Sequence, residues 1–94
     1  ESVDTVDTKG ELNVSNTTLA LNGSSAVGTY ITYKNQDGYY DASEIQITNE
    51  RGSKVNDSVC KVTADDPGAI CTFYKAGTYI AKAGEKQMTI IVSE

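Results

Sequence analysis

The sequence predicts an all-β sandwich, and three observations carry this prediction. Thr, Val, Ile and Tyr are the residues that strands favour, and they dominate the candidate strands, whereas helix signals are nearly missing. Gly, Asn and Asp recur about every eight to twelve residues, the spacing of short strands joined by turns. The length of 94 residues suits one sandwich domain. We therefore expect residues 10–94 to form the domain and residues 1–9 to be a linker or an edge strand.

The first half of the chain begins with a strand that the sequence interrupts. Residues 11–14 and 18–21 are expected to be two pieces of a first strand, because Ser-Asn-Thr at 15–17 breaks the pattern. Residues 22–25 (Asn-Gly-Ser-Ser) predict a turn. The longest strand follows at 26–34. Alternation places four of its side chains on one face: Val27, Thr29, Ile31 and Tyr33.

A turn and a shorter strand come next. Asn-Gln-Asp-Gly at 35–38 predicts a turn, since Gly38 can supply the positive φ that several turn types require. Residues 44–48 predict a strand in which Ile45 and Ile47 point the same way. The polar stretch 49–57 is expected to be a connection.

The last third of the chain predicts two hairpins. Strands are expected at 58–63 and 69–74 around an Asp-Asp-Pro-Gly turn, and again at 77–83 and 87–92 around Gly84. Alternation assigns an inward series of residues to these strands, and a slip of one residue would place the whole series in water. The series is Val62, Phe73, Tyr79, Ala81, Ala83, Met88, Ile90 and Val92.

The two cysteines are expected to be a structural disulfide. Cys60 and Cys71 would face each other across the first hairpin if the pairing axis falls between Asp65 and Asp66. A bond there would add about 2–3 kcal/mol of stability by the loop-entropy relation. An even cysteine count in a small polar domain is typical of exported proteins. Buried free thiols are the alternative.

Composition excludes several classes of function. Thirteen acidic side chains against eight basic ones, a net charge of −5, disfavour nucleic acid, which requires an excess of Lys and Arg. The absence of His removes the usual general base near neutral pH. No apolar run approaches the roughly 18 residues of a membrane span. We expect no catalytic residues, no cofactor, no resident metal and no direct membrane insertion.

The turn and strand motifs resemble those of bacterial immunoglobulin-like domains. The similar features are the Gly-Ser-Ser step at 23–25, the Asp-Gly turn at 37–38, and Lys-Ala-Gly-Thr-Tyr at 75–79 followed by Met-Thr-Ile-Ile-Val at 88–92. Such domains stand in tandem in invasin- and intimin-type adhesins and in phage virion proteins. The resemblance implies an immunoglobulin-like β-sandwich of about seven antiparallel strands. Filamin-type repeats are similar too, although the chain lacks their Gly-Ser-Pro-Phe segment.

The candidate partner surface combines exposed aromatics and polar loops. Tyr39 and Tyr40 are adjacent in a turn, so one of them must face outward, and the loops at 35–40 and 49–55 are expected to offer the variable surface. Asp41 and Arg51 are the further candidate residues of this surface. Packing of these tyrosines against the end of the sandwich is the alternative. Two further alternatives stay open: calcium binding by Asp65 and Asp66, and glycosylation at four Asn-X-Ser/Thr sites. These sites are Asn13, Asn16, Asn22 and Asn56.

The function expected from these features is non-catalytic. We expect an adhesion or spacer module of an exported, multidomain surface or virion protein, located outside the cell. Its partners would be neighbouring immunoglobulin-like domains in the same chain and a host protein or glycan. A carbohydrate-binding module that uses Tyr39 and Tyr40, or an intracellular filamin-type scaffold repeat, is the alternative. Tyr79 is expected to be a corner tyrosine whose hydroxyl bonds to a loop backbone.

Overall fold

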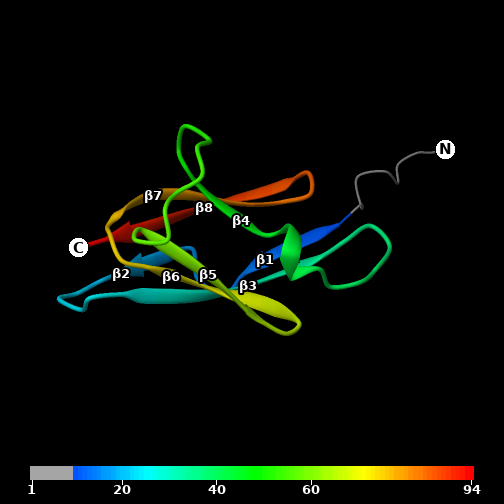
Figure 1. Cartoon of the computed structure of the whole chain (residues 1–94), viewed down its shortest axis with the longest axis horizontal. Coiled ribbons are helices and arrows are strands. Elements are labelled where there is room, and N and C mark those ends of the chain that lie inside the picture. Colours follow the sequence, from blue (N-terminus) through cyan, green and yellow to red (C-terminus); the bar gives the residue numbers. More distant parts are fainter. Residues whose placement is uncertain (1–9) are drawn as a thin grey trace.

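The computed structural model describes residues 10–94 as two four-stranded sheets, a sandwich-like all-β fold (Figure 1). The expectation for residues 1–9 lies outside the described residues. The first sheet has the order β1 (Glu11–Val14), β3 (Val27–Lys34), β6 (Gly68–Phe73) and β5 (Cys60–Asp65). The second has the order β2 (Thr18–Ala20), β8 (Lys86–Ser93), β7 (Gly77–Ala83) and β4 (Gln46–Asn49). A 3-10 turn (Ala42–Glu44) precedes β4.

The predicted break in the first strand is where the chain changes sheets. β1 pairs antiparallel with β3, and β2 pairs parallel with β8 in the other sheet. Thr29 is buried and holds this crossover, because its hydroxyl lies 3.1 Å from that of Ser15 and accepts a 3.0 Å hydrogen bond from the backbone N–H of Asn16. An inward-facing threonine thus satisfies polar groups that the change of sheet removes from the ladder.

The core lies between the sheets and is formed by the inward residues of both. Ile31, Cys71, Phe73 and Ile90 are fully enclosed. The inward series of 26–34 is confirmed, since Thr29, Ile31 and Tyr33 are buried and the partly buried Val27 packs against the core. Ile45 and Ile47 are also buried, although the strand begins at Gln46 rather than at residue 44.

Two residues expected in the core are more exposed than predicted. Val62 and Met88 keep their inward parity, but 37% of each is exposed. Val62 lies on β5, an edge strand whose partner in the described part of the chain is β6. Met88 lies where β8 extends beyond β2, which covers only Ile91 to Ser93. Periodicity identifies the face of a strand but not where the neighbouring strand ends.

The expected register of the first hairpin is wrong by two residues. Cys60 pairs with Phe73 and Cys71 pairs with Val62, so the cysteines are diagonal neighbours and do not face each other. The ladder continues to Asp65 opposite Gly68, which leaves Asp66 and Pro67 as the turn. Tyr30 secures that turn: its hydroxyl donates to the Asp65 carbonyl at 2.9 Å and accepts from the Gly68 N–H at 3.0 Å. A shift of two residues preserves the faces, which is why the inward side was still predicted correctly.

The first and last strands place the two ends of the described chain at opposite ends of the sandwich. β1 begins at the end that carries the β3–β4, β5–β6 and β7–β8 connections, and β8 finishes at the opposite end (Figure 1). The register agrees, since Glu11 pairs with Lys34 at the end of β3, whereas Ser93 pairs with Ala20 just before the turn that leads into β3.

Candidate functional site

The candidate surface is centred on residues 35–41, which we call the tyrosine loop. Asn35 organises it: its side-chain Oδ1 accepts hydrogen bonds from the N–H groups of Asp37 and Tyr39, both at 3.0 Å. The Asn35 N–H donates to the Tyr39 carbonyl at 2.7 Å, and the Gly38 N–H donates to the Asn35 carbonyl at 2.9 Å. Gly38 has φ +89°, a conformation that glycine adopts readily. The backbone that presents the tyrosines is therefore closed by four hydrogen bonds of the loop itself.

Both tyrosines of the loop face solvent. Tyr39 is 71% exposed and Tyr40 is 53% exposed, so the prediction that at least one faces outward is confirmed. The Lys34 ammonium lies 5.5 Å from the centre of the Tyr40 ring, a cation–π distance that holds this ring against the end of β3. The sequence analysis did not include Lys34 in the candidate surface. Its position directly before Asn35, where the tyrosine loop begins, could have indicated that it lies beside the tyrosines.

A shallow hollow adjoins the tyrosine loop. It has a volume of about 410 Å³ and is lined by Gly10, Glu11, Lys34, Asn35, Gln36 and Gly38. Its walls thus offer a carboxylate, an ammonium and two amides beside exposed aromatic rings. Aromatic rings with nearby hydrogen-bonding groups are the combination that interfaces use for amphipathic partners.

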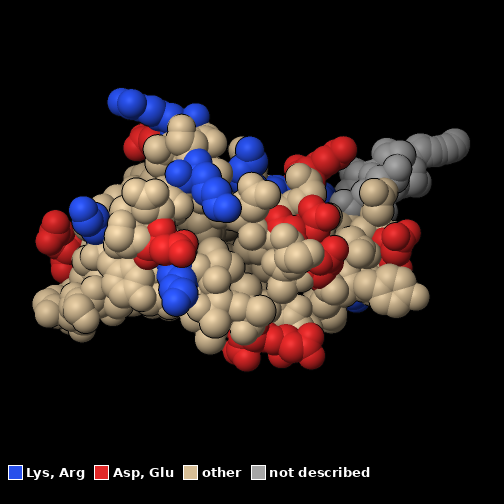
Figure 2. Space-filling view, viewed as in Figure 1, with Lys and Arg blue, Asp and Glu red and all other residues tan. Residues whose placement is uncertain are grey.

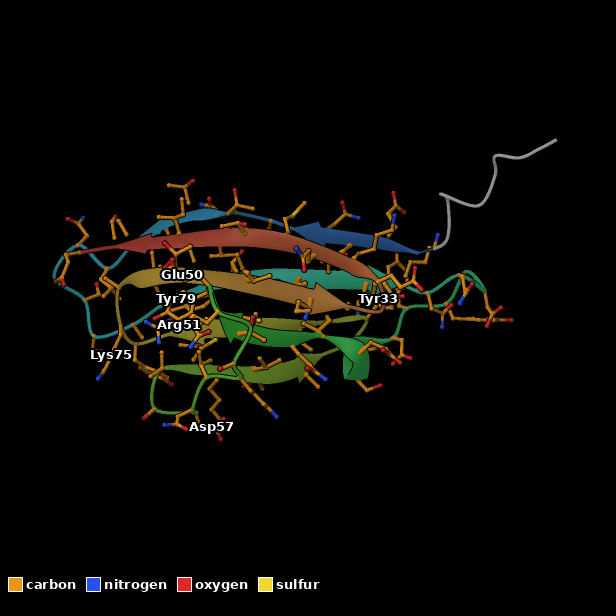
Figure 3. The ribbon with its side chains drawn as sticks, turned by 90° about the horizontal axis from the view of Figure 1, so that it is seen from above. Tyr33, Glu50, Arg51, Asp57, Lys75 and Tyr79 are labelled. Carbon is orange, nitrogen blue, oxygen red and sulfur yellow. The ribbon has the colours of Figure 1, made fainter. Side chains whose placement is uncertain are left out.

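The four candidate residues do not form one surface. Asp41 caps the 3-10 turn, since its Oδ1 accepts from the Ser43 N–H at 3.2 Å and from the Ser43 hydroxyl at 2.5 Å. Arg51 follows β4 and lies toward the opposite end of the sandwich from Tyr33, the residue that leads into the tyrosine loop (Figure 3). Arg51 and the tyrosines thus lie on the two separate candidate loops, because β4 carries the chain from one end of the sandwich to the other.

Arg51 belongs to a second loop with the same backbone design. Asn49 Oδ1 accepts from the N–H groups of Arg51 at 2.9 Å and Ser53 at 3.0 Å, as Asn35 does for residues two and four further along. The Gly52 N–H donates to the Asn49 carbonyl, and the Asn49 N–H donates to the Ser53 carbonyl. The signal was present in the sequence as two Asn-X-X-Gly runs, at 35–38 and 49–52. Ser53 therefore occupies the loop position that Tyr39 occupies at the other end.

Charge is unevenly distributed over the molecule. Figure 2 shows acidic side chains mostly toward the end of the tyrosine loop, and Lys and Arg mostly toward the other half. The connections at the tyrosine end carry exposed Asp37, Asp66 and Glu85. A field of this sign disfavours anionic partners at the tyrosine loop and favours neutral or cationic ones.

The cysteines are buried thiols on neighbouring strands. Cys60 is 3% exposed and Cys71 is fully enclosed, and both thiols are free in the structure. The pKa of Cys71 is raised well above its ordinary value, first by a hydrogen bond with the Cys60 thiol and then by burial. Two residues placed diagonally across a pair of strands are about 7–8 Å apart, whereas the Cβ atoms of directly facing residues are about 4.5–5.5 Å apart. Closing a disulfide would therefore draw the edge strand β5 toward Cys71.

The predicted bond of the Tyr79 hydroxyl to a loop backbone is confirmed. The Tyr79 hydroxyl donates a 2.7 Å hydrogen bond to the Lys75 carbonyl, four residues upstream in the β6–β7 connection. The Tyr79 ring is buried, and its centre lies 4.7 Å from that of Phe73. The bond fixes the connection to the core just before β7 begins.

We expect Tyr79→Phe to lower the free energy of unfolding by about 1 kcal/mol, because it removes one hydrogen bond and keeps the buried ring. Urea unfolding followed by circular dichroism measures the loss. Tyr74→Phe, at a tyrosine that is 41% exposed, is the matched control and should be close to neutral. Equal effects of the two substitutions would contradict the role of the corner.

We also expect the reduced protein to lose stability in alkali. The pKa of Tyr79 is raised by burial and then by the nearby Cys60, and that of Cys71 is raised as described. Unfolded Cys and Tyr ionise near their ordinary pKa values of 9.0 and 10.0, so above about pH 9 the unfolded state binds fewer protons than the folded state. The contribution of both groups is complete below pH 9 and falls as the pH rises. Urea midpoints at about pH 7 and about pH 10.5 test this, and equal midpoints would contradict it.

Calcium binding by Asp65 and Asp66 is not supported by a cluster of ligands in the described part of the chain. Over residues 10–94 there is no group of three or more His, Cys, Asp or Glu side chains placed to hold a metal ion. The same residues include no helix that is long and apolar enough to cross a membrane.

Comparison with known proteins identifies no relative. No protein-family model, no curated protein and no solved structure matches the chain.

Proposed function

We propose that this chain is a non-catalytic, immunoglobulin-like module of an exported, multidomain surface or virion protein, acting as an adhesion or spacer domain. The observation that carries the proposal is the layout of the sandwich, with the chain emerging at opposite ends and a preformed aromatic loop at one of them. This layout suits a module that is strung between neighbours and presents its loops to a partner.

The strand order supports the immunoglobulin-like type. If β1 and β2 are the two halves of a first strand A, the remaining strands are B to G in chain order. The sheets then have the orders A-B-E-D and A′-G-F-C, which matches the constant-type arrangement with its seven strands. The Tyr79 bond to Lys75 stands at the E–F corner, where such sandwiches carry a tyrosine corner. Neither feature depends on sequence similarity.

The ends of the chain support a tandem arrangement. A module whose chain enters beside the tyrosine loop and leaves from the far end of the sandwich can be joined to sister domains without folding back (Figure 1). In such an array the neighbouring immunoglobulin-like domains are the first partners.

The tyrosine loop supports a partner outside the array. Its two rings are exposed although a polar substitute fits the same backbone, as Ser53 shows in the loop organised by Asn49. Exposed tyrosine is favoured at binding interfaces because it contributes a large contact area with few rotatable bonds. The second candidate function, carbohydrate binding, is favoured by the polar hollow beside these rings, and the acidic surroundings point to a neutral glycan.

Binding to a glycan array and to host cells tests the adhesion proposal. We expect Tyr39→Ser to lose at least about tenfold in affinity, since hot-spot aromatics contribute about 2 kcal/mol or more. The substitution keeps the loop, because serine stands at the equivalent position after Asn49. Tyr74→Ser, at an exposed tyrosine that follows β6, is the control. Retained binding by the Tyr39→Ser variant would contradict the adhesion role and leave only the role of a spacer. Loss of cell binding without loss of glycan binding would favour a protein partner.

We further propose that Cys60 and Cys71 close to a disulfide in the exported protein, as an extracellular location permits. Cys60 and Cys71 are buried diagonal neighbours on the adjacent strands β5 and β6, on the same inward face. The diagonal placement keeps the gain below the roughly 3 kcal/mol of the loop-entropy relation. An intracellular filamin-type scaffold would instead keep both thiols reduced, so the redox state of the native protein separates the two.

A further inference from the structure

The two thiols differ in their access to solvent. β5, which carries Cys60, is an edge strand, whereas β6, which carries Cys71, lies between β3 and β5. Cys71 is flanked by Thr29 on one side and Val62 on the other, and none of its surface is exposed. A reagent that approaches through the sheet edge meets Cys60 first.

A groove leads to Cys60. It lies between the edge strands of the two sheets, has a volume of about 260 Å³, and includes Gln46, Ile47, Lys54, Asp57, Cys60 and Val62 among its lining residues. Cys71 does not line it in the described structure. The 37% exposure of Val62, which pairs with Cys71, marks where the groove opens over β5.

We propose that Cys60 is the thiol that reacts with external disulfides, and that Cys71 is the resolving thiol that can react only with Cys60. This inference rests on the proposed closure of the pair and adds its order of events and the class of its co-reactant, a low-molecular-weight disulfide. The groove makes Cys60 a site of S-thiolation whenever Cys71 is missing.

The chemistry balances as two thiol–disulfide exchanges with glutathione disulfide. Cys60 gives its proton to water, and its thiolate attacks one sulfur of glutathione disulfide. A mixed disulfide forms at Cys60, and one glutathione leaves as a thiolate that takes up a proton. Cys71 then gives its proton to water and attacks the Cys60 sulfur. The second glutathione leaves in the same way, so two protein thiols and one glutathione disulfide become one protein disulfide and two glutathiones.

Burial supports this order. The thiolate is the nucleophile, and a hydrogen bond with the Cys60 thiol and then burial raise the pKa of Cys71. Cys71 is therefore a poor first nucleophile, but it is the diagonal neighbour of Cys60 on the paired strand and can resolve the mixed disulfide. In the reverse direction an external thiol would attack Cys60 and Cys71 would be the leaving group, which makes the closed bond slow to reduce.

Single-cysteine variants of the reduced protein, incubated with glutathione disulfide, test the assignment by intact mass. We expect the Cys71→Ala variant to gain one glutathione at Cys60 at least about tenfold faster than the Cys60→Ala variant gains it at Cys71. Both variants should react at similar rates in denaturant. Equal native rates, faster reaction at Cys71, or no native reaction at either would overturn the assignment.

The wild-type protein supplies a second readout that needs no substitution. Quenching early in its oxidation and mapping the peptides should find the transient mixed disulfide at Cys60, and finding it at Cys71 would overturn the order. Failure of the proposed Cys60–Cys71 disulfide can be distinguished from failure of this assignment. If the Cys71→Ala variant is modified but the wild type never closes, Cys60 remains the reacting thiol and the disulfide of the proposed function is wrong.

Discussion

Phe73→Ala should lower the free energy of unfolding by about 4 kcal/mol, within the range measured for buried aromatic residues. Phe73 is fully enclosed at the end of β6 and packs on Tyr79, with ring centres 4.7 Å apart. Its removal leaves a cavity beside the corner tyrosine and also loses the contact between the rings. The loss is a large share of the roughly 5–15 kcal/mol that stabilises a small domain.

Denaturant unfolding of three variants measures this effect. Ile91→Ala, at an outward residue that is 49% exposed, should cost less than about 1 kcal/mol. Phe73→Leu keeps most of the volume and should cost about 1–1.5 kcal/mol, so it remains informative if Phe73→Ala does not fold. A Phe73→Ala variant no less stable than Ile91→Ala would show that the core lies elsewhere.

Gly68→Ala should cost about 3 kcal/mol, at the upper end of the usual penalty for overpacking. A Cβ at Gly68 would lie 2.2 Å from the backbone carbonyl oxygen of Ile31 and 2.8 Å from a methyl of Thr32. The obstacle is the backbone of the neighbouring central strand, which cannot rotate away as a side chain can. Relief requires β6 to move from β3 and weakens the bond from the Gly68 N–H to Tyr30.

Gly38→Ala separates this close approach from the general cost of replacing glycine. No atom lies within 4 Å of a Cβ at Gly38, but its φ is +89°. The substitution should therefore cost about 1–2 kcal/mol for the left-handed conformation alone. A Gly68→Ala variant as stable as the wild type would contradict the tight packing of β6 on β3.

Most of the fold could be predicted from local patterns in the sequence. Alternation placed Thr29, Ile31 and Tyr33 on one face, and turn residues placed the connections, because both signals are local in the sequence. The exposure of Val62 and Met88 was missed, since it depends on where a neighbouring strand stops. The hairpin register was missed by two residues, because a symmetric cysteine pairing was assumed where Asp66 and Pro67 alone form the turn.

The candidate site was less accessible from sequence than the fold. Adjacent tyrosines in a turn correctly indicated exposed rings, because two neighbours cannot both turn inward. Arg51 lies on the second candidate loop, and no sequence pattern showed that β4 carries this loop to the other half of the molecule. Thr29 at the change of sheet and Tyr30 over the β5–β6 turn act through contacts 13 to 38 residues apart. No local pattern reports such contacts.

The central claim, an exported module with a covalently closed hairpin, is tested most directly by peptide mapping of the native protein without reduction. Free thiols are blocked at the moment of isolation, and mass spectrometry then reads the linkage and the four Asn sites in one digest. We expect a peptide that joins Cys60 to Cys71. Two blocked, unlinked cysteines in protein from its natural compartment would contradict the claim and favour an intracellular scaffold.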